Sequence, residues 1–213
     1  NRITTIVLNQ IFRQAAKSKI IVNAHRVNEG MNFIEDKKAD IDGNEDIELL
    51  DDFFFINENR PERIVDTIIS LCSGRLKKYG DFDFLNNIQI ITPTKKGMVG
   101  TKELNKILQE KLNQKVEGDI EKQSMGATFR VGDRVMQIKN NYDIFWEKRG
   151  NTYETGTGVF NGELGTIKII DDIEKRIKIL FDDEKIAWYS YQDLEQIEHA
   201  YAITVHKAQR KRI

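Results

Sequence analysis

The sequence contains one cysteine and three histidines in 213 residues. A single cysteine cannot form an internal disulfide, and no paired cysteines and histidines occur at the spacing of zinc ligands. We therefore expect neither a disulfide framework nor a bound metal. Cys72 follows the mostly apolar residues 68–71, which predicts a thiol that is buried in the core.

Long apolar runs and a large net charge are also missing. No apolar run approaches the roughly 18 residues of a membrane span, and residues 1–5 lack the basic-then-apolar layout of a signal peptide. We expect a cytoplasmic chain with no membrane partner. The formal net charge is −1, so the chain is not a polycation that binds nucleic acids non-specifically. Any contact with DNA must come from a local patch.

A third absence concerns nucleotide binding. A P-loop has the sequence G-x-x-x-x-G-K-[ST], in which backbone N–H groups and the lysine bind phosphates. This chain has no Gly-Lys dipeptide, so it cannot hold a triphosphate alone in this way. Residues 182–184 are acidic and follow an apolar strand pattern, as Mg²⁺-binding acids do, but Lys178 interrupts that pattern and no P-loop precedes it. We interpret residues 182–184 as the tip of a hairpin.

The first half of the sequence alternates between helix and strand patterns. Apolar spacing in residues 6–28 predicts two short helices, of which Ser18 caps the second. The polar residues 29–52 predict a loop that leads into a buried strand at residues 53–56. Pro61 suits the first turn of a further helix. The second helix is expected to bury Ile21, Val22, Ala24 and Val27.

The sequence continues its alternation of strand and helix patterns to residue 112 and changes to strand patterns alone from about residue 129. Residues 88–93 predict a strand and residues 101–112 a helix, and this alternation is typical of an α/β layer with a parallel sheet. From about residue 129, short strands separated by turns predict a small β-barrel, inserted before the chain returns to the α/β layer at residues 199–204. The Gly- and Thr-rich residues 148–158 predict a mobile loop. Barrel strands are expected at residues 130–138, 165–170, 176–181 and 185–189, with a tight turn at Asn161-Gly162.

Three places carry side chains that suit phosphate contacts. Arg13 lies beside Phe12 on a predicted helix, and its planar guanidinium can bind a phosphate through two hydrogen bonds. Two other sets follow strand ends, where ligands of open α/β sheets gather. Each place also has an ordinary alternative, namely a surface arginine, a solvated loop or a structural histidine. The strand-end sets are Thr92, Pro93, Thr94 and Lys95, and Thr204, His206, Lys207 and Gln209.

Taken together, these segments resemble the RecD-like superfamily 1 DNA helicases, which include the exodeoxyribonuclease V alpha chain. The segments in question are residues 12–15, 20–28, 92–93, 129–142, 159–163 and 200–209. The most specific are Gly132-Asp133-Arg134-Val135-Met136-Gln137-Ile138-Lys139-Asn140-Asn141-Tyr142 and Thr204-Val205-His206-Lys207-Ala208-Gln209. One departure is the tail 210–213, because the family has a glycine and then small and acidic residues at this place.

The resemblance implies an α/β fold, a RecA-like parallel-sheet motor domain of the P-loop NTPase type without its P-loop. This domain would comprise residues 1–125 and 196–213, with an SH3-like β-barrel inserted at residues 126–195. Arg13 would contact the γ-phosphate of ATP, while Gln14 and Gln209 would line the nucleotide cleft. The residues implied to contact single-stranded DNA are Thr92, Pro93, Thr94, Lys95, Asn140, Asn141, Thr204, His206 and Lys207.

The resemblance also implies cofactors and partners. ATP and Mg²⁺ would be held by the full-length parent and not by this chain alone, which we expect to be inactive as an ATPase. Partners would be single-stranded DNA, the N-terminal motor domain of the parent and other nuclease subunits, in 5′ to 3′ unwinding for DNA recombination and repair. An alternative is a non-enzymatic adaptor whose barrel binds a peptide through aromatic side chains, and another is a barrel that stacks on DNA bases. The relevant rings are Trp146, Tyr153, Trp188, Tyr189 and Tyr191.

Overall fold

The computed structural model describes residues 17–35, 38–41, 44–48, 50, 52–76, 80, 82–150 and 153–209. The chain divides into two compact units, residues 1–58 and residues 59–213, and each is described by itself. The first of the two predicted N-terminal helices, together with Arg13 and Gln14, lies outside the described residues. Within the described ranges no helix is long and apolar enough to cross a membrane.

Helix α1 (Lys19–Asn28) of the first unit begins where the sequence predicts. The Ser18 hydroxyl accepts a hydrogen bond from the Ile21 N–H and donates one of 2.5 Å to the Asp52 carboxylate. A hairpin of strands β1 (Lys38–Ile41) and β2 (Asn44–Glu48) follows. The prediction of a loop throughout residues 29–52 is therefore wrong in its middle part.

The predicted buried face of α1 is only partly correct, because Ile21 and Val22 are half-buried. The buried residues of this helix are Lys19 and Asn23, whereas Val27 is 60% exposed and Ala24 is exposed as well. Asn23 is buried because its side-chain amide donates to the Ile34 carbonyl and accepts from the Ile34 N–H. Hydrogen bonds to the backbone, which hydrophobic spacing does not detect, thus decide which face of α1 is covered.

The strand expected at residues 53–56 is not formed. Phe54 is 68% exposed, although the rings of Phe53 and Phe55 both contact Phe33. The aromatic run therefore packs through ring contacts and not through a sheet ladder.

The second unit contains a helical layer around one parallel strand pair. Helix α2 starts with Pro61 in its first turn, as predicted, and continues into a short π-helical stretch, η2. Helix α4 covers the predicted residues 101–112. Strands β3 and β13 pair in parallel, and they are the only parallel pair of strands among the described residues. The elements of this layer are α2 (Pro61–Ser70), η2 (Leu71–Arg75), α3 (Phe84–Asn87), β3 (Ile90–Thr92), α4 (Thr101–Leu112), β13 (Ala202–Thr204) and α5 (Val205–Ala208).

The core of this layer confirms the prediction for Cys72. Its side chain is buried in one cluster with Leu104 and Leu108 of α4. In the same cluster the rings of Phe84 and Tyr201 stack with their centroids 5.7 Å apart. Burial raises the pKa of the Cys72 thiol to about 11.

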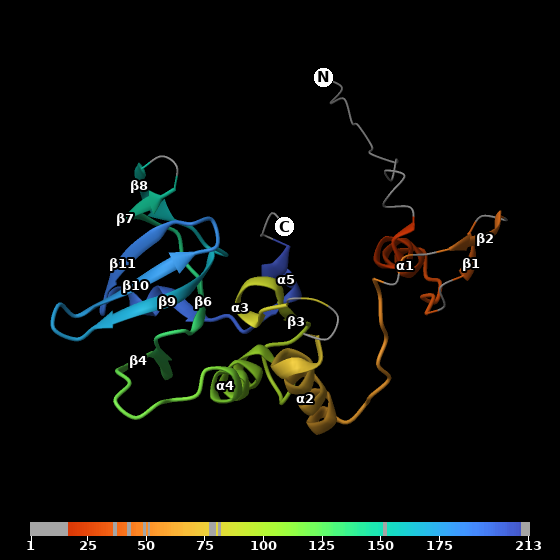
Figure 1. Ribbon diagram of the computed structural model, residues 1–213, viewed down its shortest axis with the longest axis horizontal. Coiled ribbons are helices and arrows are strands. Elements are labelled where there is room, and N and C mark those ends of the chain that lie inside the picture. The colour runs from red at the N-terminus through yellow and green to blue at the C-terminus, as the bar shows by residue number, and fades with distance from the viewer. Residues whose placement is uncertain are drawn as a thin grey trace, which may run out of the picture. The chain divides into compact units, whose positions relative to one another are not determined.

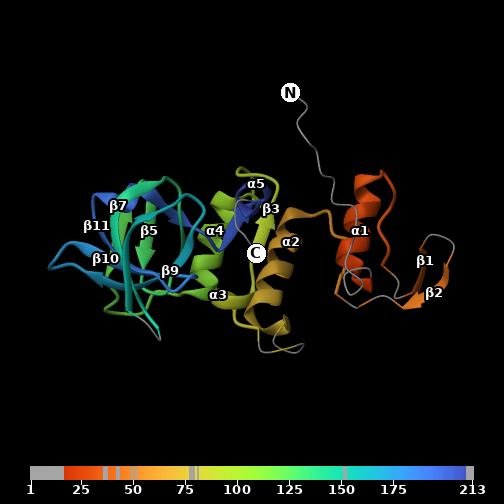
Figure 2. The ribbon, with the colours of Figure 1, turned by 90° about the horizontal axis from the view of Figure 1, so that it is seen from above.

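The rest of the second unit is built from antiparallel strands. Seven strands form one sheet in the order β12-β6-β9-β10-β11-β7-β8, and a two-stranded hairpin, β4–β5, precedes them. Figures 1 and 2 show α4 between α2 and this sheet. The strands are β4 (Glu121–Ser124), β5 (Ala127–Arg130), β6 (Arg134–Gln137), β7 (Asn141–Arg149), β8 (Tyr153–Val159), β9 (Leu164–Asp171), β10 (Arg176–Phe181), β11 (Ile186–Ser190) and β12 (Ile197–His199), and the short 3₁₀ helix η4 (Asp193–Gln196) precedes β12.

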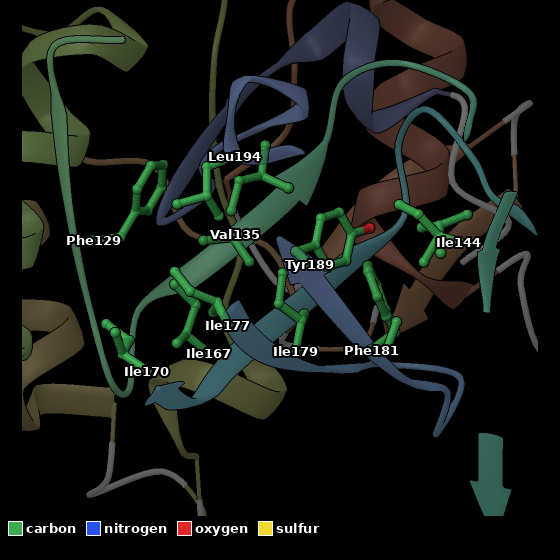
Figure 3. Packing of buried hydrophobic residues seen from close by; sticks show 13 residues of the cluster. Phe129, Val135, Ile144, Ile167, Ile170, Ile177, Ile179, Phe181, Tyr189 and Leu194 are labelled. Atoms are coloured by element: carbon green, nitrogen blue, oxygen red, sulfur yellow. The ribbon is translucent and has the colours of Figure 1, made fainter. Parts of the chain in front are cut away.

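One face of the seven-stranded sheet packs against an apolar core, shown in Figure 3, to which Phe129 of β5 and Leu194 of η4 also contribute. Along β10 every second side chain is buried, namely Ile177, Ile179 and Phe181, as the period of two along a strand requires. Tyr189 of β11 and Ile167 of β9 lie in the same core. Because each such side chain stabilises a fold by about 1.5–3 kcal/mol when fully buried, this core fixes the register of β9, β10 and β11.

The strand predictions for this region are partly confirmed. The range of β10 is the predicted one, and the acidic residues 182–184 form the predicted hairpin tip between β10 and β11. The single strand expected at residues 130–138 is wrong, because a turn with Gly132 at φ +90° separates β5 from β6. The predicted Asn161-Gly162 turn is present, with Gly162 at φ +100°. It joins β8 to β9, which are not neighbours in the sheet.

The prediction of a loop throughout residues 148–158 is wrong as well. Residues 148–149 and 153–158 belong to the paired strands β7 and β8. Gly156 pairs with Trp146 across the two strands, and a Cβ atom added at Gly156 would lie 2.4 Å from the indole. The glycine therefore marks the close approach of a ring to a strand and not a flexible segment.

Candidate nucleic-acid interface

The parallel pair brings two of the predicted site segments together. In its register Thr92, the last residue of β3, lies opposite Thr204, the last residue of β13. Parallel strands end at the same edge of a sheet, where ligands of open α/β sheets gather. Residues 92–95 and 204–207, called here the carboxyl edge, therefore lie side by side, and α5 also contacts β3.

The β3 side of the carboxyl edge is a loop held by its own hydrogen bonds. The buried Thr92 hydroxyl donates to the Val99 carbonyl at 2.7 Å, and the Thr94 hydroxyl accepts from the Lys96 N–H at 3.3 Å. The loop is joined to the first turn of α4, where the Thr101 N–H donates to the Thr94 carbonyl. Thr92 is thus a loop-closing residue, while Pro93 and Lys95 are exposed and available to a ligand.

The β13 side presents a shorter set of polar groups. Thr204 is partly buried and immediately precedes α5, and His206 is exposed. The Lys207 ammonium forms an ion pair with the Glu198 carboxylate. Gln209 is exposed at the end of the described chain. Of the predicted residues here, His206 and Gln209 are the most accessible to a bound strand.

Sequence reasoning missed the residue that holds β13 in place. Asn105 of α4 accepts a hydrogen bond of 2.7 Å from the Ala202 N–H. Its amide nitrogen donates to the carbonyls of His199 and Ala202, each at 3.0 Å. A polar residue at a position that faces the core of a predicted helix is the signal that would have identified it.

Asn140 and Asn141 belong to a different part of the second unit. The Asn140 side-chain oxygen accepts from the Asn161 N–H at 2.9 Å, and the Asn141 amide donates to the Gln196 side chain at 2.9 Å. The Asn140 side chain therefore links the turn between β6 and β7 to the turn between β8 and β9, and the Asn141 side chain links β7 to η4. Arg13 and Gln14 are not described, so their predicted place beside a nucleotide stays a prediction.

The aromatic side chains that would support a peptide-binding adaptor do not share one exposed surface. Tyr189 is fully buried, and Trp146 and Tyr191 pack against the same core. Trp188 and Tyr153 are exposed, but the guanidinium of Arg176 already lies 4.3 Å from the centre of the Trp188 ring. These five side chains therefore do not line one groove in which a peptide could bind, as the adaptor hypothesis requires.

Comparisons with known proteins identify similar sequences. Residues 104–181 match the family model of the SH3 domain of ATP-dependent RecD-like DNA helicases. The ATP-dependent RecD2 DNA helicase of Deinococcus radiodurans is 29% identical over 205 residues, which cover 96% of this chain and 23% of that protein. An uncharacterized protein of Methanocaldococcus jannaschii is 30% identical over 161 residues, or 70% of this chain and 13% of that protein. The chain thus spans less than a quarter of the length of these two relatives.

Solved structures of Pif1 helicases are also similar to parts of the chain. Unliganded Pif1 from a Bacteroides species is 16% identical, with a TM-score of 0.35, over 60% of this chain and 44% of that one. Pif1 helicase from Bacteroides in complex with ADP-AlF3 and single-stranded DNA is 17% identical, with a TM-score of 0.36, over 69% of this chain and 36% of that one.

Proposed function

We propose that this chain is the second motor domain of a longer ATP-dependent DNA helicase. Two findings support the proposal: residues 104–181 match the family model of the SH3 domain of RecD-like DNA helicases, and a RecD2 relative aligns with 96% of the chain. In this proposal it binds single-stranded DNA and forms one wall of the ATP cleft. The parent moves 5′ to 3′ and acts in DNA recombination and repair.

The observation that carries this proposal is the pairing of Thr92 with Thr204 at the carboxyl edge. Two segments that are more than a hundred residues apart in the sequence place polar and basic side chains at one edge of a parallel pair. Lys95 and His206 are exposed there. Such groups suit the phosphate backbone, which positions a strand without reading its bases.

The sequence of this chain lacks the usual triphosphate-binding motif. There is no P-loop in the sequence, and the described residues contain no group of three carboxylate, histidine or cysteine side chains that could hold a metal ion. We propose that ATP and Mg²⁺ bind mainly to an N-terminal motor domain of the parent. Arg13, Gln14 and Gln209 would face that nucleotide from this side.

Location and further partners follow from the same proposal. We propose that the parent acts in the cytoplasm, either alone or with other nuclease subunits.

DNA binding by this chain tests the role of the carboxyl edge. We expect weak binding of a fluorescent oligothymidylate, with an affinity that falls steeply as the salt concentration rises. A plot of the logarithm of the binding constant against the logarithm of the salt concentration should have a slope of about −0.7 for each phosphate contact with a single strand. The double substitution Thr204→Ala, His206→Ala should weaken binding, whereas Thr155→Ala, on the exposed part of β8, should not. Binding that ignores salt, or that is equal in both variants, contradicts the proposal.

ATP hydrolysis by the full-length parent tests the motor itself. Single-stranded DNA should stimulate turnover, and Arg13→Ala should abolish the stimulated rate because the γ-phosphate loses its charged partner. The 213-residue chain should show no turnover above background. A parent that hydrolyses ATP equally well with Arg13→Ala would remove this arginine from the cleft.

A further inference from the structure

A buried carboxylate joins the seven-stranded sheet to the helical layer. Asp133, in the turn between β5 and β6, is 0% exposed. One of its oxygens accepts from the Tyr201 hydroxyl at 2.8 Å and from the Asn113 amide at 2.7 Å. The other accepts from the Gln109 amide at 2.6 Å and from the Arg130 N–H at 2.8 Å. These donors come from α4 and the residue after it, from β5 and from the residue before β13.

His199 is a fifth donor to this carboxylate. Its Nε2 lies 3.1 Å from the Asp133 carboxylate and 3.2 Å from the Gln109 amide nitrogen. The two N–H groups of Gln109 are already used, one by Asp133 and the other by the Thr128 carbonyl at 2.7 Å. Nε2 of His199 therefore carries a proton and donates it to Asp133. Gln109, Asn113, Asp133, His199 and Tyr201 are called here the Asp133 cluster.

Along α4 the cluster continues toward the carboxyl edge. Asn105 and Gln109 are four residues apart and so lie on one side of the helix, and Asn113 is the first residue after its end. Asn105 holds Ala202 of β13 through its backbone N–H and carbonyl. The N-terminal end of the same helix is bonded to the loop after β3, through the Thr101 N–H and the Thr94 carbonyl. Helix α4 thus connects the sheet, β13 and both segments of the carboxyl edge.

We propose that Asp133 is a positioning residue, which fixes the segment 199–204 on α4 and so sets where Thr204 lies opposite Thr92. The inference rests on the proposed function only for its consequence in DNA binding. The cluster itself is an interaction within this chain. A charged acceptor suits this role because each donor that loses it is left buried and unpaired, so the arrangement is either complete or strongly disfavoured.

Hydrogen exchange of the 213-residue chain tests the positioning directly. Asp133→Asn keeps the shape but turns an NH₂ group toward donors, whichever way the amide points. Exchange at backbone amides 199–204 should become at least about tenfold faster, since each orphaned buried donor costs enough to change the opening equilibrium by that factor. Asp171→Asn is the matched control, because the Asp171 carboxylate accepts from the backbone N–H groups of Ile173 and Glu174 in the turn between β9 and β10. It should leave amides 199–204 within about twofold of the parent chain.

A milder variant covers the case in which Asp133→Asn does not fold. Tyr201→Phe removes one donor and leaves the carboxylate with four, so the fold should persist and exchange at amides 199–204 should still rise several-fold. Faster exchange confined to this segment in either variant supports the proposal. Unchanged exchange there, or an equal increase throughout the second unit, overturns it.

The functional consequence is measured in the full-length parent. Asp133→Asn should raise the DNA concentration for half-maximal ATPase stimulation by about tenfold, with the DNA-independent rate unchanged. The control Asp171→Asn should change neither the DNA concentration nor the DNA-independent rate. An unshifted DNA requirement in Asp133→Asn, despite faster local exchange, would overturn the link to Thr204. A parent without any DNA-stimulated turnover would instead refute the proposed function, and the exchange result would still decide the positioning role.

Discussion

Replacing Tyr189 with phenylalanine tests the energetic account of the seven-stranded sheet. The Tyr189 hydroxyl, fully buried, donates to the Gln137 side-chain oxygen at 3.0 Å. Tyr189→Phe keeps the ring and its packing, removes one hydrogen bond and leaves the buried oxygen of Gln137 without this donor. The expected loss is about 1–3 kcal/mol of unfolding free energy, the cost of an unsatisfied buried polar group.

The assay is urea unfolding followed by tryptophan fluorescence. Trp146 and Trp188 are the two tryptophans of the chain and both lie in this sheet, so the signal reports its unfolding. Tyr191→Phe is the matched control, because its hydroxyl bonds the exposed Asp172 and water can replace it. That variant should lose less than about 0.5 kcal/mol.

The same substitution in a Gln137→Leu chain separates the hydrogen bond from the packing of the ring. In a Gln137→Leu chain the acceptor is absent, so Tyr189→Phe should cost nothing or should stabilise the sheet. An equal loss in both backgrounds would refute the argument, because the effect would then come from packing and not from the hydrogen bond.

Three other predictions concern the second unit. Gly165→Ala should destabilise the sheet by about 1–3 kcal/mol, because a Cβ atom there would lie 2.8 Å from both the Ile179 side chain and the Leu180 carbonyl, whereas Gly150→Ala meets nothing within 4 Å and should be neutral in the same urea assay. Asn105→Ala should lower the free energy of unfolding by about 2–4 kcal/mol, because the hydrogen bonds to His199 and Ala202 are lost. The control Lys106→Ala, at an exposed position of the same helix, should lower it by less than about 0.5 kcal/mol. Thermal melts followed by circular dichroism measure both. The raised pKa of Cys72, about 11 against 9.0 for a free thiol, means that the folded chain keeps this proton as pH rises from 9 to 11. Its contribution to stability is therefore complete below pH 9 and lost as pH rises toward 11, and a Cys72→Ala chain should show a smaller alkaline decline in urea midpoints.

Sequence patterns predicted the elements whose stability is local. Helix α4 has apolar residues at helical spacing, and Pro61 marks the start of α2, so both follow from short-range rules. Strand β10 alternates buried and partly buried side chains over its whole predicted range. The patterns failed where the pairing of strands decides. Gly156 lies in a strand because β8 pairs with β7, where Trp146 is its partner.

The candidate site was predicted in outline but not in its support. The strand ends at Thr92 and Thr204 could be located, because each follows an apolar strand, and their neighbouring positions are seen in the register of β3 and β13. The commitment of the Thr92 hydroxyl to a loop carbonyl could not be predicted, since it depends on how the loop folds back. Asn105 and Asp133 were missed for the same reason. Their partners come from distant elements that single-sequence patterns do not connect.

The pairing of β6 with β12 has a consequence for how this chain tolerates change. These strands are the first and last of the seven-stranded sheet in sequence order, and they are bonded to each other from Val135 and His199 to Gln137 and Ile197. The polypeptide thus enters and leaves the seven-stranded sheet through two neighbouring strands that are hydrogen-bonded to each other. Insertions or tags at the distant hairpin tips, such as residues 172–175 between β9 and β10, should therefore leave the structure of the helical layer unchanged. Lineages could therefore lengthen or replace those hairpins while the spacing of the carboxyl edge is kept.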